Sequence, residues 1–354
     1  MDKLLINKKR KFFDKAEPYI IAEIGVNHEG SFEKAIQLIN LAKEGGADAA
    51  KFQSYKAKTL ASRNSPSYWD TSKESTKSQY ELFKKYDLFN QKEYIELADY
   101  CKKVGIDFLS TPFDDNSVDF LSPLVPFFKI ASADITNIPF LRKIARKGKP
   151  IVLSTGAANL SEIDIAFSTI KEITGEPPSL MHCILCYPTL DENANLLMIK
   201  HLNKCFPESI IGYSDHTVPD QSMTTVVSSF LLGAKIIEKH FTYDKKLPGN
   251  DHYHAMDIND LKNLKYNLDK VTKLLGEKEY KQPIKEEEIS RKNARRSIVT
   301  KSNLNAGHIL KEDDITYKRP GTGISPMFWD NIIGRQLRVN LSEDHLLQWS
   351  DLQE

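Results

Sequence analysis

Short apolar runs recur along this chain, and each is followed by a longer stretch with apolar residues at helical spacing. The first run, YIIAEIGV at 19–26, precedes a predicted helix that stops at Gly45 and Gly46. Further runs lie at 49–55, 107–113, 127–132, 150–156, 179–185, 209–215 and 234–241. Apolar strands that alternate with helices are typical of a parallel sheet covered on both faces. Eight such units in about 280 residues predict a (β/α)8 TIM barrel, an α/β fold.

One long insertion interrupts this pattern after the second predicted strand. Residues 56–89 are polar, rich in Lys and Ser, and carry Tyr68, Trp69 and Tyr80 at intervals. Loops of this length are usually functional or disordered. Because the insertion follows a barrel strand, it is interpreted either as a lid over the carboxyl ends of the strands or as a mobile surface excursion.

The composition changes after the helix predicted around 260–275. We predict a barrel domain over 1–280, a charged linker over 281–297 and a small β-rich domain over 298–354, where short strands alternate with Gly and Pro turns. A unit of about 55 residues is marginal for an independent core. We therefore expect it to pack on the barrel or on another subunit.

Composition narrows the class of protein. The 49 basic residues balance the 48 acidic ones, so charge gives no reason to expect nucleic acid or a membrane surface as a partner. The N-terminus lacks the apolar run of a signal peptide, and no stretch approaches the roughly 20 apolar residues that span a bilayer. Four cysteines without a signal peptide favour reduced thiols in the cytoplasm. For Cys183 and Cys186, a CxxC inside an apolar run, packing is preferred over a redox or zinc role.

Polar residues gather where each predicted strand ends, which is where barrel enzymes carry their catalytic groups. Burying charge without a partner is costly, so eight polar strand ends are difficult to explain by packing alone. They are Glu23, Asn27, Lys51, Gln53, Ser110, Thr111, Lys129, Ser132, Ser154, Thr155, Tyr187, Ser214, Asp215, His216, Glu238 and His240. Lys239, on the opposite face of its strand, is expected to be structural.

The types of these side chains suggest a division of tasks. Lys51 and Lys129, with neutral serine donors, suit a small ligand that carries a phosphate and a carboxylate. His216 and His240 suit a divalent metal with open positions for water and a substrate oxygen. The spacing fits two hydrogen-bonded core histidines equally well.

The motifs around these residues resemble those of the sialic acid synthase family. They are IAEIGVNHEG at 21–30, KFQ at 51–53, STPFD at 110–114, KIASAD at 129–134, STG at 154–156, YPT at 187–189, GYSDHT at 212–217 and EKHFT at 238–242. In the tail, KRPGTGISP at 318–326 resembles the antifreeze-like (SAF) domain of that family. The resemblance covers nearly the whole chain apart from the extreme N-terminus and 56–89.

The resemblance implies a transferase that condenses phosphoenolpyruvate with an N-acylated amino sugar, foremost N-acetylmannosamine, to give N-acetylneuraminate and phosphate. It implies phosphoenolpyruvate contacts from Lys51, Thr111, Lys129, Ser132, Ser154 and Ser214. It implies sugar contacts from Glu23, Gln53, Tyr187, Asp251 and Arg319. It implies Mn²⁺ or Mg²⁺ held by His216 and His240, with catalytic roles for Glu23, Lys51 and Glu238. It also implies a domain-swapped homodimer, in which the small domain of one chain caps the barrel of the other.

Two departures from the family pattern leave the sugar open. Leu185 stands two positions before Tyr187, where the family usually has a polar residue, often Asn. The segment GNDHYHAMD at 249–257 adds His252 and His254, interpreted as solvated loop residues in preference to substrate contacts. Legionaminic or pseudaminic acid synthesis from a 6-deoxy diacetamido hexose is therefore an alternative.

Two further alternatives differ in reaction or in class. A related single-domain aldolase using a plain sugar phosphate would lack the tail at 298–354. A non-catalytic barrel with a carbohydrate- or ice-binding tail would be expected to lose its polar strand ends, which are intact here.

Overall fold

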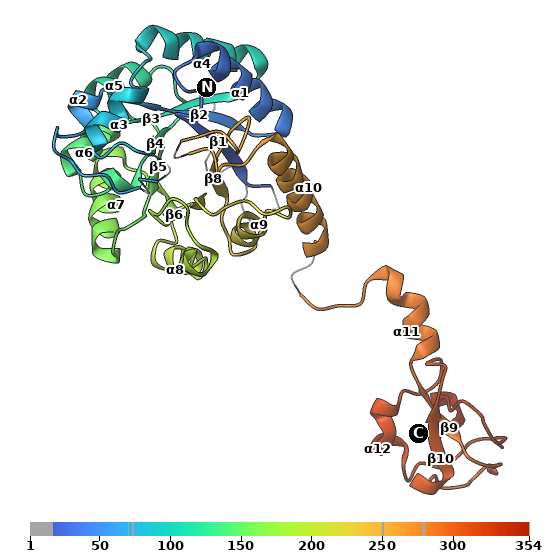
Figure 1. Ribbon diagram of the computed structural model, residues 1–354. Coiled ribbons are helices and arrows are strands. Elements are labelled where there is room, and N and C mark those ends of the chain that lie inside the picture. The colour runs from blue at the N-terminus through green and yellow to red at the C-terminus, as the bar shows by residue number, and fades with distance from the viewer. Residues whose placement is uncertain (1–16, 70, 73, 250, 278–279, 354) are drawn as a thin grey trace. The chain divides into compact units, whose positions relative to one another are not determined.

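A computed structural model describes residues 17–69, 71–72, 74–249, 251–277 and 280–353. The chain divides into two compact units, Met1–Gly276 and Glu277–Glu354 (Figure 1).

The first unit contains all eight predicted strands, and every strand pair is parallel. They are β1 (Tyr19–Gly25), β2 (Ala49–Ser54), β3 (Asp107–Pro112), β4 (Phe128–Ile130), β5 (Ile151–Ser154), β6 (Ser179–Cys183), β7 (Ile211–Asp215) and β8 (Ile236–His240). The sheet order is β3-β2-β1-β8-β7-β6-β5-β4, and β3 and β4 at its two ends also contact each other. The predicted barrel is therefore confirmed, with helices around it (Figure 1).

The helices of this unit follow the strands in the predicted alternation. They are α1 (Phe32–Gly45), α2 (Ala57–Leu60), α3 (Gln79–Tyr86), α4 (Gln91–Val104), α5 (Asp115–Leu121), α6 (Ile138–Ala145), α7 (Leu160–Thr174), α8 (Leu197–Cys205), α9 (Thr224–Leu231) and α10 (Ile258–Leu275). Helix α7 shows how local sequence sets their bounds. Asn159 and Glu162 bond each other's backbone N–H groups at its start, and Gly175 ends it at φ 71°.

The insertion at 56–89 is folded onto the barrel unit through its own buried contacts. It contains α2 and α3, and the buried Trp69 donates its indole N–H to the carbonyl of Glu74 at 3.1 Å. Glu74 in turn pairs with Lys85 of α3 at 2.9 Å. At the end of the insertion, Phe89 stacks on His28 of the loop after β1, with ring centroids 4.3 Å apart. These contacts fix the insertion beside the loop that follows β1.

The second unit has a small core of its own. It contains α11 (Glu288–Ala294), the antiparallel strands β9 (Ser297–Thr300) and β10 (Ile315–Lys318), and α12 (Trp329–Ile332). This core consists of Ile298, Leu304, Leu310, Ile315, Ile324, Ile332, Leu337, Leu341, Leu347 and Leu352. Helix α11 lies within the predicted linker and has no buried residue.

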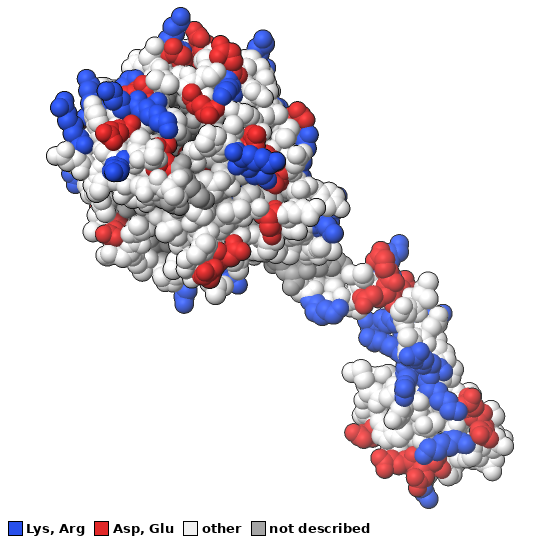
Figure 2. Space-filling model, viewed as in Figure 1, with Lys and Arg blue, Asp and Glu red and all other residues white. Residues whose placement is uncertain are grey.

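Both signs of charge occur close together on the visible face of the barrel unit, as the balanced composition leads one to expect (Figure 2). Among the described residues, none of the helices combines the length and apolar character needed to cross a bilayer.

Candidate active site

Strand register brings several of the predicted site residues beside one another at the carboxyl ends of the strands. Glu23 of β1 lies opposite Lys51 of β2 on one side and opposite His240 of β8 on the other. Ser214 of β7 lies opposite Glu238 of β8. All five are buried. The polar end of β8 therefore faces polar ends of β1 and β7, which explains why an apolar strand finishes in charged residues.

Two lysines and two carboxylates form a buried charge network at this end of the barrel. The Lys51 ammonium lies 2.6 Å from Oε2 of Glu23 and 3.6 Å from Oε1 of Glu238. Lys129 of β4 reaches the same Glu238 oxygen at 3.2 Å. Lys51 also donates to the hydroxyl of Thr111 at 3.0 Å. The two positive and two negative charges sum to zero, which limits the penalty of burying them.

Burial and charge pairing shift the pKa values of these groups in different directions. Burial raises the pKa of Glu23. Lys51 opposes this shift, and the negative charge of the neighbouring Glu238 adds to it. Burial would also raise the pKa of Glu238, but Lys129 and Lys51 hold it at about 2. Burial lowers the pKa of Lys129. The two carboxyl groups thus differ in how readily they hold a proton.

The three predicted serine ligands have different environments. Ser132 accepts a hydrogen bond from the backbone N–H of Gly156 at 2.9 Å, and Ser214 donates to Glu238 at 3.4 Å. The buried Ser154 hydroxyl has no hydrogen-bond partner within the part of the chain that the structure describes. A buried hydroxyl without a partner is uncommon in proteins, and a ligand oxygen would satisfy it.

The two predicted metal-ligating histidines lie beside each other, with ring centroids 5.4 Å apart. Nδ1 of His216 lies 2.8 Å from the carbonyl of Ile184, which can only accept. Nδ1 therefore carries the proton, and Nε2 is the nitrogen left to bind a ligand. Tyr187 packs against His216 with ring centroids 4.2 Å apart and reaches the edge of His240 at 6.1 Å.

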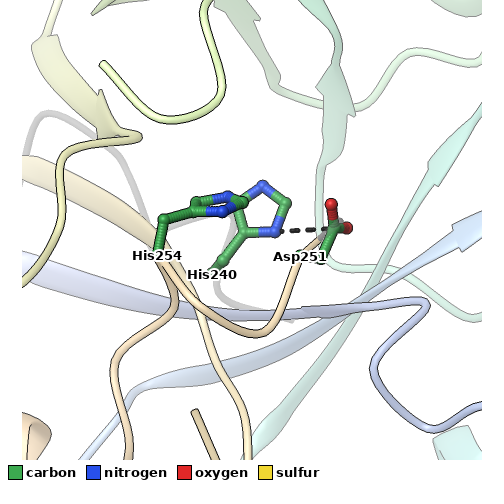
Figure 3. A group of neighbouring side chains, drawn as sticks. All are labelled: His240, Asp251 and His254. Atoms are coloured by element: carbon green, nitrogen blue, oxygen red, sulfur yellow. Dashed lines mark ion pairs between the residues drawn. The ribbon is translucent and has the colours of Figure 1, made fainter. Parts of the chain in front are cut away.

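The loop between β8 and α10 brings Asp251 and His254 to this histidine pair. The loop returns to the end of β8, where the N–H of Met256 donates to the carbonyl of His240 at 2.8 Å. Oδ2 of Asp251 then lies 3.4 Å from Nδ1 of His240, and the His254 ring centroid lies 4.8 Å from that of His240 (Figure 3). One possible ligand atom from each of the three residues lies within 4.8 Å of the others.

The interpretation of His252 and His254 as solvated loop residues was wrong. His252 is only 3% exposed and His254 is fully buried. His252 bonds the hydroxyl of Thr242 at 2.8 Å. Their burial depends on the return of the loop to β8, which sequence spacing does not show. The sequence signal that could have identified His254 as a site residue is its position three residues after Asp251.

A pocket opens at this end of the barrel, with a volume of about 720 Å³ that includes space open to solvent. The predicted residues Gln53, Tyr187, His240 and Asp251 line one part of it. The inserted segment lines another part with Tyr68, Trp69, Leu82, Phe83 and Tyr86. The insertion therefore covers the site with an aromatic wall, in agreement with the lid interpretation.

Two other strand-end residues have structural partners. Lys239, predicted to be structural, pairs with Asp215 at 2.6 Å and donates to the carbonyl of Thr217 at 2.6 Å, all of it buried. Tyr213 donates to the other oxygen of Asp215 at 2.9 Å.

Arg319, the predicted sugar contact of the tail, belongs to the second unit and is exposed there.

Fold and site together define a class of protein, a TIM barrel with a buried lysine–carboxylate network and a histidine cluster, followed by a small β-rich unit. A model of the NeuB family matches residues 38–280, and a SAF domain model matches residues 295–353. The chain belongs to the NeuB family, which confirms the resemblance to the sialic acid synthases. Synthases of this family are enzymes that make nonulosonic acids.

Individual relatives cover almost the whole chain. An uncharacterised protein of Methanocaldococcus jannaschii is 41% identical over 99% of both chains. The N,N'-diacetyllegionaminic acid synthase of Legionella pneumophila is 39% identical over 95% of this chain and 94% of its own. A crystal structure of the N-acetylneuraminic acid synthetase of Leptospira borgpetersenii superposes with a TM-score of 0.68 at 33% identity, covering 78% of this chain and 90% of that one. More distant relatives include N-acetylneuraminate-9-phosphate and pseudaminic acid synthases at 34% and 32% identity.

Proposed function

We propose that this protein condenses phosphoenolpyruvate with an N-acylated amino hexose to give a nine-carbon α-keto acid and phosphate. The observation that carries the proposal is the pair of buried lysines, Lys51 and Lys129, beside a histidine cluster at one end of a NeuB-family barrel. The SAF match at 295–353 favours this reaction over that of the single-domain aldolases. Free cysteines agree with a cytoplasmic location for the reaction.

N-acetylmannosamine is the first sugar to test, and N-acetylneuraminate is then the product. A 6-deoxy diacetamido hexose is the second candidate, favoured by the 39% identity to the Legionella relative. The aromatic wall from the insertion, with Tyr68, Trp69 and Phe83, is also suited to pack against methyl groups of such a sugar.

The phosphoenolpyruvate side of the site is assigned to the lysine network. Lys51 and Lys129 hold the phosphate and carboxylate in place, which lowers the entropic part of the barrier. The free hydroxyl of Ser154 supplies a further donor, and Thr111, Ser132 and Ser214 complete the set. In this arrangement the ligand anions share the two cations with Glu238.

The sugar side is assigned to the pocket. Gln53, which donates to Glu23 at 2.9 Å, lines it together with Tyr187 and Asp251. Arg319 of the SAF domain is proposed as a further contact to the sugar.

The donor set fits a divalent ion, Mn²⁺ or Mg²⁺, held by His216 and His240. Nε2 of His216 is left without a proton by the bond of Nδ1 to Ile184, so it can act as a ligand. When bound, such an ion would polarise the carbonyl oxygen of the open-chain sugar.

The reaction joins C3 of the enol to the aldehyde carbon of the sugar. Water adds to the neighbouring carbon of phosphoenolpyruvate, and phosphate leaves by C–O cleavage. Burial raises the pKa of Glu23, so Glu23 is the better candidate to supply or accept a proton. Glu238, with a pKa of about 2, stays ionised and keeps the lysines oriented.

The first expected result is phosphate release that needs both a sugar and a metal. Purified protein with phosphoenolpyruvate and Mn²⁺ should release phosphate when N-acetylmannosamine or a 6-deoxy diacetamido hexose is added, and mass spectrometry should find a nine-carbon keto acid. Chelation by EDTA should stop the reaction and Mn²⁺ should restore it. Release that is independent of any amino sugar, or full activity in EDTA, would contradict the proposal.

We further propose that the active form is a domain-swapped homodimer, which predicts complementation between two inactive variants. His240→Ala damages the barrel site and Arg319→Ala damages the SAF contribution. Mixed dimers would contain one site with both parts intact. After co-expression, activity should return to about one quarter of wild type, because half of the dimers are mixed and one of their two sites is intact.

The control for this experiment is co-expression of His240→Ala with a His240→Ala, Arg319→Ala double variant. That pair has no intact barrel and should stay inactive. If the first pair also stays inactive although both variants fold, the SAF domain acts on its own barrel.

A further inference from the structure

The strongest feature that these assignments leave unused is His254. It lies on the loop between β8 and α10, and the backbone fixes its place. The N–H of Thr242 donates to the carbonyl of Met256 at 3.0 Å, and the N–H of Met256 donates to the carbonyl of His240 at 2.8 Å. The hydroxyl of Tyr253 donates to the carbonyl of Tyr187 at 2.9 Å. His254 is thus held in the site between two anchored neighbours.

The His254 side chain is buried and its polar atoms are unsatisfied. It is fully buried, and neither ring nitrogen has a hydrogen-bond partner among the residues that the structure describes. The contrast with His252 on the same loop is direct, because His252 bonds Thr242. A buried polar group without a partner is unfavourable and is often explained by an ion or ligand that binds there.

Other side chains that could bind a metal ion surround His254. Its ring lies 4.8 Å from that of His240 and 6.4 Å from that of His216, measured between centroids. Asp251 supplies a carboxylate at 3.4 Å from His240. Two adjacent ligands of an octahedral ion bound at about 2.1 Å lie roughly 3 Å apart. The separations of up to 4.8 Å in this group are therefore within reach of small side-chain rotations.

We propose that His254 is a further protein ligand of the divalent ion, so that the centre combines His216, His240 and His254 with the carboxylate of Asp251. The proposal extends the metal dependence proposed above from two histidines to a cluster. It gives the ion one of the two His254 ring nitrogens that have no hydrogen-bond partner among the described residues. It also predicts that Co²⁺, which is better suited to imidazole ligands, binds more tightly than Mn²⁺ or Mg²⁺.

The test measures metal binding without turnover. Metal-free, full-length protein is titrated with Mn²⁺, and free Mn²⁺ is followed by electron paramagnetic resonance. We expect His254→Ala to weaken Mn²⁺ binding about 10-fold or more, the size of effect seen even for residues that only support a ligand. His252→Ala, from the same loop, is the matched control and should bind Mn²⁺ as the wild type does.

Two further measurements separate loss of a ligand from loss of the fold. The unfolding temperature of metal-free His254→Ala should equal or exceed that of the wild type, because an unsatisfied buried imidazole has been removed. The rise in unfolding temperature on adding Mn²⁺ should shrink. If the alanine variant does not fold, His254→Gln replaces it in both measurements. The visible spectrum of bound Co²⁺ should change in either variant, because a nitrogen ligand is lost.

Unchanged Mn²⁺ affinity and an unchanged Co²⁺ spectrum in both His254 variants would overturn the proposal. A wild-type protein that binds Mn²⁺ through His254 but releases no phosphate with any amino sugar would leave this proposal standing and reject the proposed function. The two outcomes are therefore distinguishable.

Discussion

Replacing Lys129 with Met is expected to weaken phosphoenolpyruvate binding by about 30-fold or more, because removing one partner of a buried charge pair costs roughly 2–5 kcal/mol. The Lys129 ammonium is buried and its carboxylate contact is Glu238, at 3.2 Å. Methionine keeps much of the volume of lysine and removes only the charge and donors. Sugar-dependent phosphate release should fall by a similar or larger factor.

Calorimetric titration with phosphoenolpyruvate measures this effect directly. The matched control is Lys143→Met, which removes a lysine that pairs with Asp119 at 3.0 Å on the surface. That variant should bind phosphoenolpyruvate like the wild type. Because Lys51 still lies 3.6 Å from Glu238, Lys129→Met should fold normally. Wild-type affinity in Lys129→Met would remove Lys129 from the proposed ligand set.

Replacing Glu238 with Gln is expected to lower the stability of the fold without weakening phosphoenolpyruvate binding. The change leaves Lys129 buried without its carboxylate partner, whereas Lys51 keeps Glu23 at 2.6 Å. The free energy of unfolding should fall by about 3–5 kcal/mol, the range measured when one partner of a buried pair is removed. Binding of phosphoenolpyruvate should be retained or strengthened, since the ligand supplies the missing negative charge.

The destabilisation in Glu238→Gln should depend on pH. Burial already lowers the pKa of Lys129 from its ordinary value of 10.5, and loss of the Glu238 charge lowers it further. At pH values between the pKa of Lys129 in the folded state and its pKa in the unfolded state, the unfolded state binds more protons than the folded state. The free energy of unfolding therefore rises with pH in this range. The difference from wild type should be large near pH 7 and smaller near pH 10, as measured by urea unfolding.

A double variant tests whether the unpaired cation is the cause. Lys129→Met combined with Glu238→Gln removes both partners, and should recover part of the stability that Glu238→Gln loses. The rise in unfolding temperature with phosphoenolpyruvate should be larger in Glu238→Gln than in wild type, and smallest in the double variant. Equal destabilisation in the single and double variants would place the effect outside the lysine network.

The sequence by itself determined the architecture and many of the residues of the candidate site. Apolar runs such as those at 19–26 and 234–241 mark strands because a parallel barrel buries both faces of each strand. The carboxyl ends of such strands meet at one end of the barrel, so Lys51, Glu238 and His240 could be grouped without a structure. The tail motif at 318–326 likewise indicated a SAF domain, which the family match confirms.

Only the tertiary structure decided which of these groups are partners. The contact of Lys51 and Lys129 with the same oxygen of Glu238 depends on strand register and barrel closure, which hydrophobic periodicity does not encode. The burial of His254 depends on a loop that pairs back onto β8 through Met256, and the aromatic wall depends on how the insertion at 56–89 packs. Loop closure brings together residues that are distant in sequence, and local sequence patterns do not predict such contacts.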